Sequence, residues 1–404
     1  MRAFVTSKEA YMETTNDHQC PAAGSEPSLI RGGPFYRIQE AARLIRPNEW
    51  NLIRRVTFAI GLGWLPLILI TAFFNTGSFV SLLKDYRVHS RMLIAVPVLL
   101  LGQLLLESRF RMVVAHIRNA DLLEPKDLAR MDDMIAKLRC LRDSLIPELA
   151  ILFLVIAHTA VSFKVRVDAT PWLSQRIGSD LHLTAAGWYA VLVSATIFQF
   201  LLGLSLWKWL LWSLFAFKLS RLDLRLVSTH PDEHGGLGFL GETPVAFAPV
   251  AFAAATVVGA TWRHEILHLG ANPMTFKQPA IAFVVIIAVV ALGPLSFFIP
   301  RLTALRRRGI LEYGILGQMH STDFHQKWVH QRTGHEAEFL TAPESSTLAD
   351  FGQSYEKLEQ LKPFAINRGT LITLAIAVVV PLLPAILAVV PLATVLKTLL
   401  EALR

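Results

Sequence analysis

The residues His264, Glu265 and His268 have the types and the spacing of a zinc-dependent hydrolase motif. In a helix, two histidines four positions apart share one face and can bind zinc, while the glutamate can act as a general base. Such a site also needs a third protein ligand and an open position for water, and no Asp, Glu or His follows until Glu312. Because the third ligand is missing from this part of the sequence, we keep a membrane-embedded zinc metalloprotease only as the alternative to a non-enzymatic role. In that alternative, Glu265 is the catalytic residue and zinc is the cofactor.

A second candidate for a metal or phosphate site consists of His230, Asp232 and His234. Four glycines whose backbone N–H groups could approach an anion lie beside them, namely Gly235, Gly236, Gly238 and Gly241. The same stretch also fits a purely structural role. Thr229 and Asp232 have the spacing of a helix capping box, and the glycines permit a sharp turn. We favour the turn and keep the ligand site as the alternative.

Glu148 and His158 are the ionisable residues of one predicted membrane span. Ionisable groups inside a membrane are functional candidates by default, because they are costly there. Both residues also lie near the predicted ends of the span, where their cost is small. They are therefore intramembrane polar candidates, with a structural role as the alternative.

The composition of the chain indicates the kind of fold that holds these candidate residues. Apolar residues make up 53% of the chain and charged residues only 17%, which predicts a polytopic membrane protein rather than a soluble domain. Because every backbone N–H and C=O group inside a bilayer must be hydrogen-bonded within the protein, we expect an all-α helical bundle as the fold. The formal charge of +8 is typical of a membrane protein that keeps Lys and Arg on one side, so we expect no nucleic-acid partner. The two cysteines, Cys20 and Cys140, are predicted on the same reducing side, without a disulfide.

Hydropathy predicts about seven spans. Six lie near residues 57–74, 92–106, 144–163, 188–217, 245–261 and 279–299, and a seventh, kinked by prolines, begins at 369. The second run is short for a span and could borrow length from its flanks. A Thr243–Pro244 pair predicts the start of the fifth helix.

The remaining segments complete the expected organisation. Residues 1–33 predict a disordered tail, 34–56 a basic lead on the membrane surface, 57–300 the six-helix region, and 369–404 a kinked span plus an external amphipathic helix. Segment 108–143 predicts an amphipathic helix packed under the bundle, and 218–244 a turn. Segment 301–368 predicts a helical loop with a capping box at Thr347 and Asp350.

Charge asymmetry predicts the orientation. Of the 39 Lys and Arg residues, 28 lie in the N-terminal segment and in segments 108–143, 218–244 and 301–368. The positive-inside rule places these segments and the N-terminus in the cytoplasm, and the C-terminus in the periplasm. Anionic lipid is the expected partner of the basic cytoplasmic segments.

Three stretches carry a resemblance to a known group of proteins. They are IRPNEW at 45–50, RLDLRLVSTHPDEHGGLGFLG at 221–241 and PLATVLKTLLEAL at 391–403. Together they resemble an uncharacterised family of bacterial polytopic inner-membrane proteins. The resemblance implies a bacterial inner-membrane location and brings no catalytic residues. We expect a non-enzymatic role in solute or ion passage, or in membrane signalling or assembly, with a homo-oligomer or an unknown protein partner left open.

Overall fold

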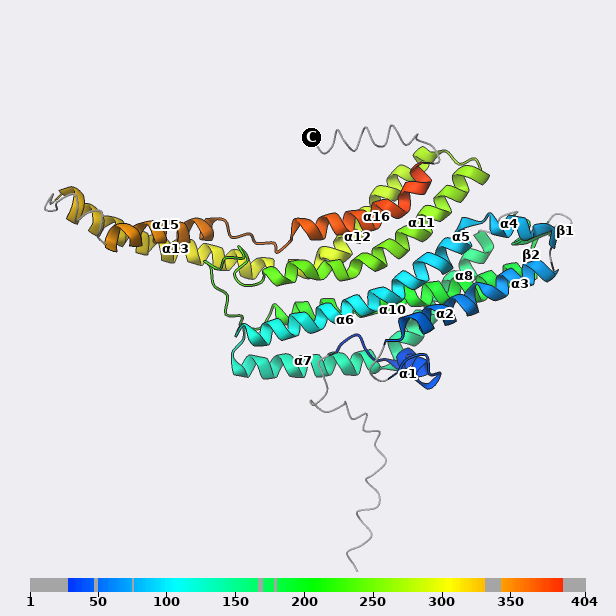
Figure 1. Cartoon of the computed structure of the whole chain (residues 1–404), viewed down its shortest axis with the longest axis horizontal. Helices are drawn as coiled ribbons and strands as arrows, with labels where there is room; N and C mark the ends of the chain where they lie inside the picture. The colour runs from blue at the N-terminus through cyan, green and yellow to red at the C-terminus, as the bar shows by residue number, and fades with distance from the viewer. Residues whose placement is uncertain are drawn as a thin grey trace, which may run out of the picture.

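The chain folds as an all-α bundle of long helices with one short β-hairpin (Figure 1). The computed structural model describes residues 28–46, 50–74, 76–165, 170–177, 180–330 and 343–387. The first half contains α1 (Pro34–Ala41), α2 (Leu52–Gly63), α3 (Leu65–Phe74), η1 (Thr76–Ser78), α4 (Phe79–Leu83), α5 (Tyr86–His89), η2 (Ser90–Ala95), α6 (Val96–Asn119), α7 (Pro125–Asp143) and α8 (Leu145–Val165).

The second half begins with the hairpin. It contains β1 (Ser174–Ile177), β2 (Asp180–Leu183), α9 (Ala185–Tyr189), η3 (Ala190–Ala195), α10 (Thr196–Leu219), η4 (Gly238–Phe247), α11 (Ala248–His268), η5 (Pro273–Phe276), α12 (Lys277–Ser296), α13 (Ile299–Phe324), η6 (His325–His330), α15 (Pro343–Glu359) and α16 (Arg368–Ile386). The strands β1 and β2 are antiparallel, and Ser174 pairs with Leu183.

The protein is a multi-pass membrane protein, as predicted. Six helical segments of the described chain are long and apolar enough to cross a membrane, and the α7–α8 pair, bent by 45°, brings the number to as many as seven. They follow the predicted order. The six are Leu52–Phe74, Tyr86–Asn119, Ala185–Leu219, Gly238–His268, Pro273–Ser296 and Arg368–Ala385.

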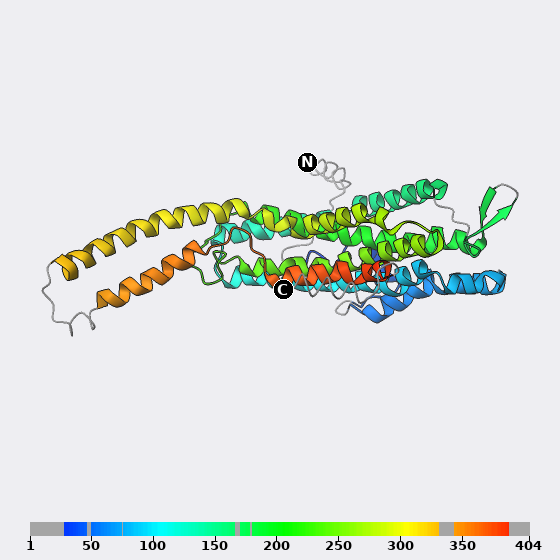
Figure 2. The same cartoon turned by 90° about the horizontal axis from the view of Figure 1, so that it is seen from above.

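Two of these segments are much longer than a bilayer requires. Tyr86–Asn119 has 34 residues and Ala185–Leu219 has 35, which corresponds to roughly 50 Å of helix against about 30 Å of hydrocarbon. The surplus extends the bundle beyond the membrane. We call the end that carries β1 and β2 the hairpin end, and the opposite end, beside α7, the α7 end. The helices α13 and α15 form an arm that projects past the α7 end (Figures 1 and 2).

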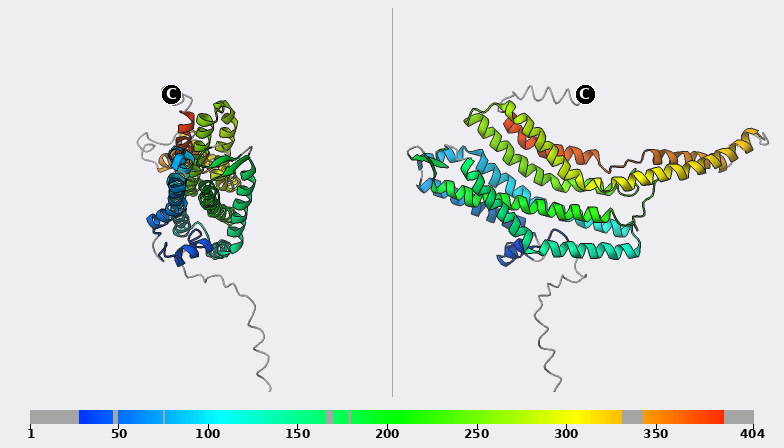
Figure 3. Two further views of the ribbon diagram at one scale, coloured as in Figure 1. Left: turned by 90° about the vertical axis from the view of Figure 1, so that its right-hand side faces the viewer. Right: turned by 180° about the vertical axis from the view of Figure 1, so that it is seen from behind.

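The core of the bundle joins helices that are distant in sequence, which group into one body when seen end-on (Figure 3). The rings of Phe110 and Phe215 pack edge to face at 5.2 Å, and both are essentially fully buried. At the contact between α11 and α16, a Cβ on Gly259 would come within 2.6 Å of the Pro381 carbonyl oxygen. Small residues at such crossings let two backbones approach closely, which is how membrane helices gain packing contacts.

The N-terminal boundaries differ from those predicted. The segment 28–33 is not a tail, because Leu29 and Ile30 are fully buried and the Ser28 hydroxyl donates a hydrogen bond of 2.8 Å to Glu107. Within the predicted basic lead, Arg55 belongs to α2 and is 4% exposed rather than lying on the membrane surface. Composition alone could not show that these polar segments have partners inside the bundle.

The helix α7 has its predicted apolar face, since Met131, Ile135 and Leu138 are buried. It runs along the bundle axis beside α6 and α10 rather than across their ends (Figure 1). The predicted helix start at Thr347 is wrong, because α15 already begins at Pro343. The predicted external helix falls on residues 388–404, which lie outside the described residues.

The cysteine prediction is also wrong. Cys140, in α7, is disulfide-bonded. The other cysteine of the sequence, Cys20, lies outside the described residues.

Candidate functional site

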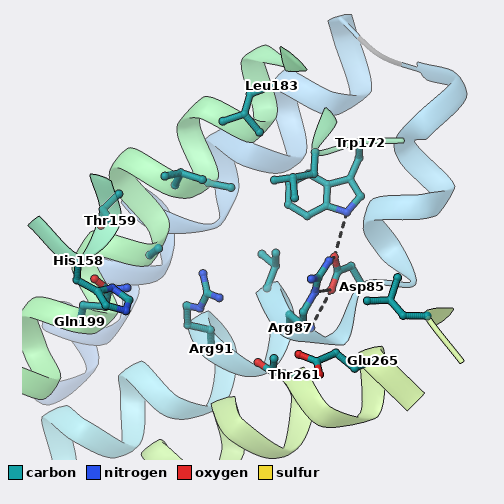
Figure 4. Close-up of a pocket in the computed structure, with 16 residues that line it drawn as sticks. Asp85, Arg87, Arg91, His158, Thr159, Trp172, Leu183, Gln199, Thr261 and Glu265 are labelled. Carbon is teal, nitrogen blue, oxygen red and sulfur yellow. Dashed lines mark hydrogen bonds and ion pairs between the residues drawn. The ribbon is translucent and has the colours of Figure 1, made fainter. Parts of the chain in front are cut away.

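A cavity of about 260 Å³ opens among the helices near the hairpin end (Figure 4). Four separate parts of the chain supply its walls: α5 with η2, α8, η3 with α10, and the last turns of α11. The residues after α8 close it with Trp172 and Leu173. The polar groups that face it are Asp85, Arg87, Arg91, His158, Thr159, Gln199, Thr261 and Glu265. Cavities with a few converging polar groups are the usual form of a ligand site.

Arg91 is the central group of this cavity. It lies in η2, a π-helical turn that precedes Pro97, and its side chain points into the space between Gln199 and Thr261 (Figure 4). Among the described residues it makes no hydrogen bond and no ion pair within 4.0 Å. A π-turn re-aims side chains and is frequent at functional sites. An intramembrane guanidinium without an anion is costly, which points to an anionic ligand.

Arg87, one turn earlier, differs from Arg91 because its guanidinium is paired with a carboxylate. Its Nε and Nη2 donate hydrogen bonds of 3.0 and 2.9 Å to the two oxygens of Asp85. The Trp172 indole donates a further bond of 3.1 Å to the same carboxylate. Burial raises the pKa of Asp85, but Arg87 outweighs it and holds that pKa below its ordinary value. Asp85 is therefore a fixed anion that binds α5 to the segment after α8, and it does not neutralise Arg91 by direct contact.

The wall formed by α8 and α10 offers unused hydrogen-bonding atoms. Thr159 Oγ1 and Gln199 Oε1 are buried and have no hydrogen-bond partner among the described residues. Leaving such atoms unpaired costs about 1–3 kcal/mol each unless a ligand or water satisfies them. Figure 4 shows both beside His158, across the cavity from Thr261 and Glu265. The cavity thus combines one cation without a direct partner, a carboxylate and neutral polar groups.

The structure divides the predicted zinc motif between two cavities. Glu265 faces the cavity just described, whereas His264 and His268 line a neighbouring one of about 530 Å³ together with Asp85. The two histidine rings lie 4.8 Å apart, with His264 buried and His268 exposed. No group of three His, Cys, Asp or Glu residues that could hold a metal occurs in the described part of the chain. The motif therefore has its pair of histidines but no described third ligand.

His230, Asp232 and His234 do come together, as their spacing suggested. His230 Nδ1 lies 2.8 Å from Asp232 Oδ1. The Asp232 carboxylate accepts backbone N–H bonds from His234 at 2.9 Å, Gly236 at 3.1 Å and Gly238 at 2.8 Å. These bonds tie the Asp232 carboxylate to the backbone of the following residues, so the arrangement organises a turn.

The chain does turn here, but the details of the structural explanation that we favoured were wrong. No α-helix starts at Thr229, so the Thr229–Asp232 pair is not a capping box. Glu233, Gly235 and Gly236 all have positive φ and reverse the chain. Thr243 is not an N-cap either, because its hydroxyl donates to the Leu240 carbonyl within η4.

Glu148 and His158 have separate surroundings. Glu148 lies in the first turn of α8 and accepts a 2.7 Å bond from the backbone N–H of Phe35, at the start of α1. His158 lies on the edge of the 260 Å³ cavity. Only His158 therefore belongs to the candidate site, and Glu148 anchors the N-terminal segment.

No family model, curated protein or solved structure matches this chain.

Arg91 was missed from the sequence because it was assigned to a loop. The signal was present, since the apolar run after it has 15 residues and a span needs about 20. Extending that helix toward its N-terminus places Arg91 inside the membrane. Gln199 was visible as a polar residue within a span, but its neighbourhood with Arg91 depends on the packing of α10 against η2.

Proposed function

We propose that this protein binds and passes a small polar solute that carries an anionic group. The observation that carries the proposal is Arg91, an intramembrane cation without a hydrogen bond or close ion pair to a described residue, aimed into a cavity. A guanidinium presents a planar fork of donors that matches a carboxylate or a phosphate. Such an anion would remove the cost of the isolated charge, and the charge would give the cavity its selectivity.

The other groups of the cavity narrow the class of solute. A volume of about 260 Å³ corresponds to roughly eight or nine water molecules at about 30 Å³ each, so the solute is small. Glu265 and Thr261 lie on the wall opposite Gln199 and can accept hydrogen bonds from a second polar group. A solute with an anionic group at one end and a hydrogen-bond donor at the other satisfies both walls.

Passage, rather than binding alone, is supported by the two longest spans. From the cavity, the spans that carry Arg91 and Gln199 continue toward the α7 end, and partway along them Gln103 and Lys208 come together. Lys208 Nζ donates a 3.2 Å bond to Gln103 Oε1, and both residues are buried. Polar groups at two levels of the same helix pair are a feature of solute pathways.

We place the protein in the bacterial inner membrane, on the resemblance of its three sequence stretches, with the α7 end in the cytoplasm. Most Lys and Arg residues belong to segments at that end, as the positive-inside rule expects. The disulfide at Cys140 argues for the reverse, because such bonds persist in oxidising compartments. Reporter fusions at residues 235 and 270 decide: activity of a cytoplasmic reporter at 235 and a periplasmic one at 270 supports this orientation, and the opposite pattern reverses it.

The function is tested with purified protein in liposomes on a solid-supported membrane. Concentration jumps of phosphate, small carboxylates and amino acids are applied to the wild type, to Arg91→Gln and to Arg118→Gln. Arg118 is on the same helix but exposed in a surface pair with Asp132. We expect at least one solute to give a wild-type current that Arg91→Gln reduces about tenfold or more, a loss of ~1.4 kcal/mol, while Arg118→Gln keeps it. Currents that are absent throughout, or equal in all three proteins, contradict the proposal.

A further inference from the structure

A second cavity, of about 210 Å³, lies toward the α7 end, between α1, α2, α6 and α10. It is separate from the cavity of Arg91 and shares no lining residue with it. Nearly all of its wall is apolar, and the residues that form this wall include Phe35, Ile38, Phe58, Leu62, Leu100 and Phe200. An apolar cavity of this kind favours a hydrocarbon chain over a hydrated solute.

The polar residues that line this cavity are Gln39 and Arg55, and Arg55 is the charged one; Gln103 and Lys208 lie behind it, outside the lining. Arg55 Nη2 donates a 3.0 Å bond to Gln103 Oε1, but its Nε and Nη1 are buried and have no acceptor among the described residues. Lys208 donates to the same amide oxygen. Two buried cations therefore share one neutral acceptor, and no carboxylate lies within 4.0 Å of either in the part of the chain that the structure describes. The arrangement lacks an anion.

Along α2, the charged group of the cavity comes first and the apolar groups follow it. Arg55, Phe58, Ala59 and Leu62 all line the cavity and share one face of the helix, being spaced by three, four and seven positions. Arg55 is one turn from the start of α2, and Leu62 lies about 10 Å further toward the hairpin end. A lipid in the adjacent leaflet has the same order, with its charge at the interface and its chain toward the midplane.

The cavity also communicates with the lipid-facing surface. Ile38, Phe58 and Leu62 line it and are 64%, 51% and 44% exposed, so their outer sides face the surroundings of the bundle. A group the size of a water molecule takes up about 30 Å³, so a cavity of 210 Å³ holds roughly seven such groups. This volume suits part of one acyl chain rather than two chains.

We propose that this cavity is a binding site for one acyl chain of an anionic lipid, whose headgroup anion binds Arg55. The chain lies along Phe58, Ala59 and Leu62, where burial of its methylene groups stabilises the complex. The headgroup supplies the acceptors that Arg55 Nε and Nη1 lack, and Lys208 adds positive potential beside them. A small inorganic anion fits less well, because it would leave the apolar wall without a partner.

The first experiment measures lipid preference in the wild type. Native mass spectrometry of the protein released from micelles with equimolar phosphatidylglycerol and phosphatidylcholine, of identical chains, reports which lipid remains bound. We expect one phosphatidylglycerol retained per chain, at least about fivefold over phosphatidylcholine. Equal retention of the two lipids overturns the proposal, whatever the behaviour of any variant.

The second experiment separates the headgroup from the chain. In Arg55→Gln we expect the preference for phosphatidylglycerol to disappear while lipid is still retained. In Ala59→Leu, which fills the cavity and keeps Arg55, we expect retention of either lipid to fall. Arg54→Gln is the matched control, because Arg54 is the exposed neighbour of Arg55 and removes the same charge outside the cavity. If Arg54→Gln abolishes the preference as fully as Arg55→Gln, the attraction is general and the site does not exist.

Discussion

Arg142 and Arg91 place the same side chain in opposite surroundings at two levels of the bundle. Arg142, in the last turn of α7, donates to the carbonyls of Ser28 and Arg31 and forms a bidentate pair with Asp143 at 2.8 and 2.7 Å. Arg91, near the hairpin end, has neither a hydrogen bond nor a close ion pair to a described residue. An arginine whose donors are bonded to its own fold holds that fold together, whereas one without partners indicates a ligand.

We expect the largest change in the free energy of unfolding when Arg142 is replaced. Arg142→Ala removes the ion pair of the Asp143 carboxylate and the side-chain bonds to the Ser28 and Arg31 carbonyls, although Arg139 still donates to Ser28 and the Gly33 N–H to Asp143. Because a partly buried charge loses its countercharge, we expect a loss of about 3–5 kcal/mol in the free energy of unfolding. Denaturant unfolding in detergent measures it. Arg118→Ala removes an exposed pair of the same type and should cost less than about 1 kcal/mol. Equal losses in the two variants would show that Arg142 is not a structural centre.

Asp232 is predicted to have the next largest effect. Burial raises its pKa, but the N–H groups of His234, Gly238 and Gly236 and the His230 ring lower it more, so its net pKa lies below the ordinary value. A carboxyl whose pKa falls on folding adds stability above its unfolded pKa and loses it as the pH falls through the folded pKa. Removing the charge in Asp232→Asn should cost about 1–3 kcal/mol at neutral pH.

The measurement for Asp232 is stability against pH below 5. The wild type should lose part of its stability as the medium becomes more acidic, and Asp232→Asn should show a smaller loss. If the variant and the wild type decline in parallel, Asp232 does not organise the turn through its charge.

Arg91→Leu is the counterpart of Arg142→Ala, because we expect it to raise the free energy of unfolding rather than lower it. No hydrogen bond is lost, and an isolated charge leaves the interior of the bundle, so stability should rise by on the order of 1 kcal/mol. Solute binding should be lost in the same variant. A strong destabilisation, comparable with that of Arg142→Ala, would show that Arg91 has a structural role instead.

Sequence reasoning found the elements that depend on local composition and missed those that depend on partners. Six of the seven predicted spans match span-length helices in the predicted order, because roughly 20 apolar residues in succession are a local signal, and the third, at α8, qualifies only together with α7. The burial of Leu29 and Ile30 could not be predicted, since it depends on Arg142 and Glu107 from distant helices. The candidate site was found only in part. His158 and Glu265 were identified, but their convergence with Arg91 comes from the packing of three helices.

The smallest predicted effect concerns the contact between the turn and the segment after α15. Lys362 Nζ lies 2.5 Å from Glu233 Oε2, but the two side chains are 62% and 35% exposed, so the pair should contribute little to stability. A double-mutant cycle with Glu233→Gln and Lys362→Met isolates that coupling, and it should fall further at high salt. The backbone bond of 2.8 Å from Lys362 N to the Glu233 carbonyl survives both changes and should keep the segments together. A coupling as large as the effect of Arg142→Ala would show that this surface pair is a structural contact despite its exposure.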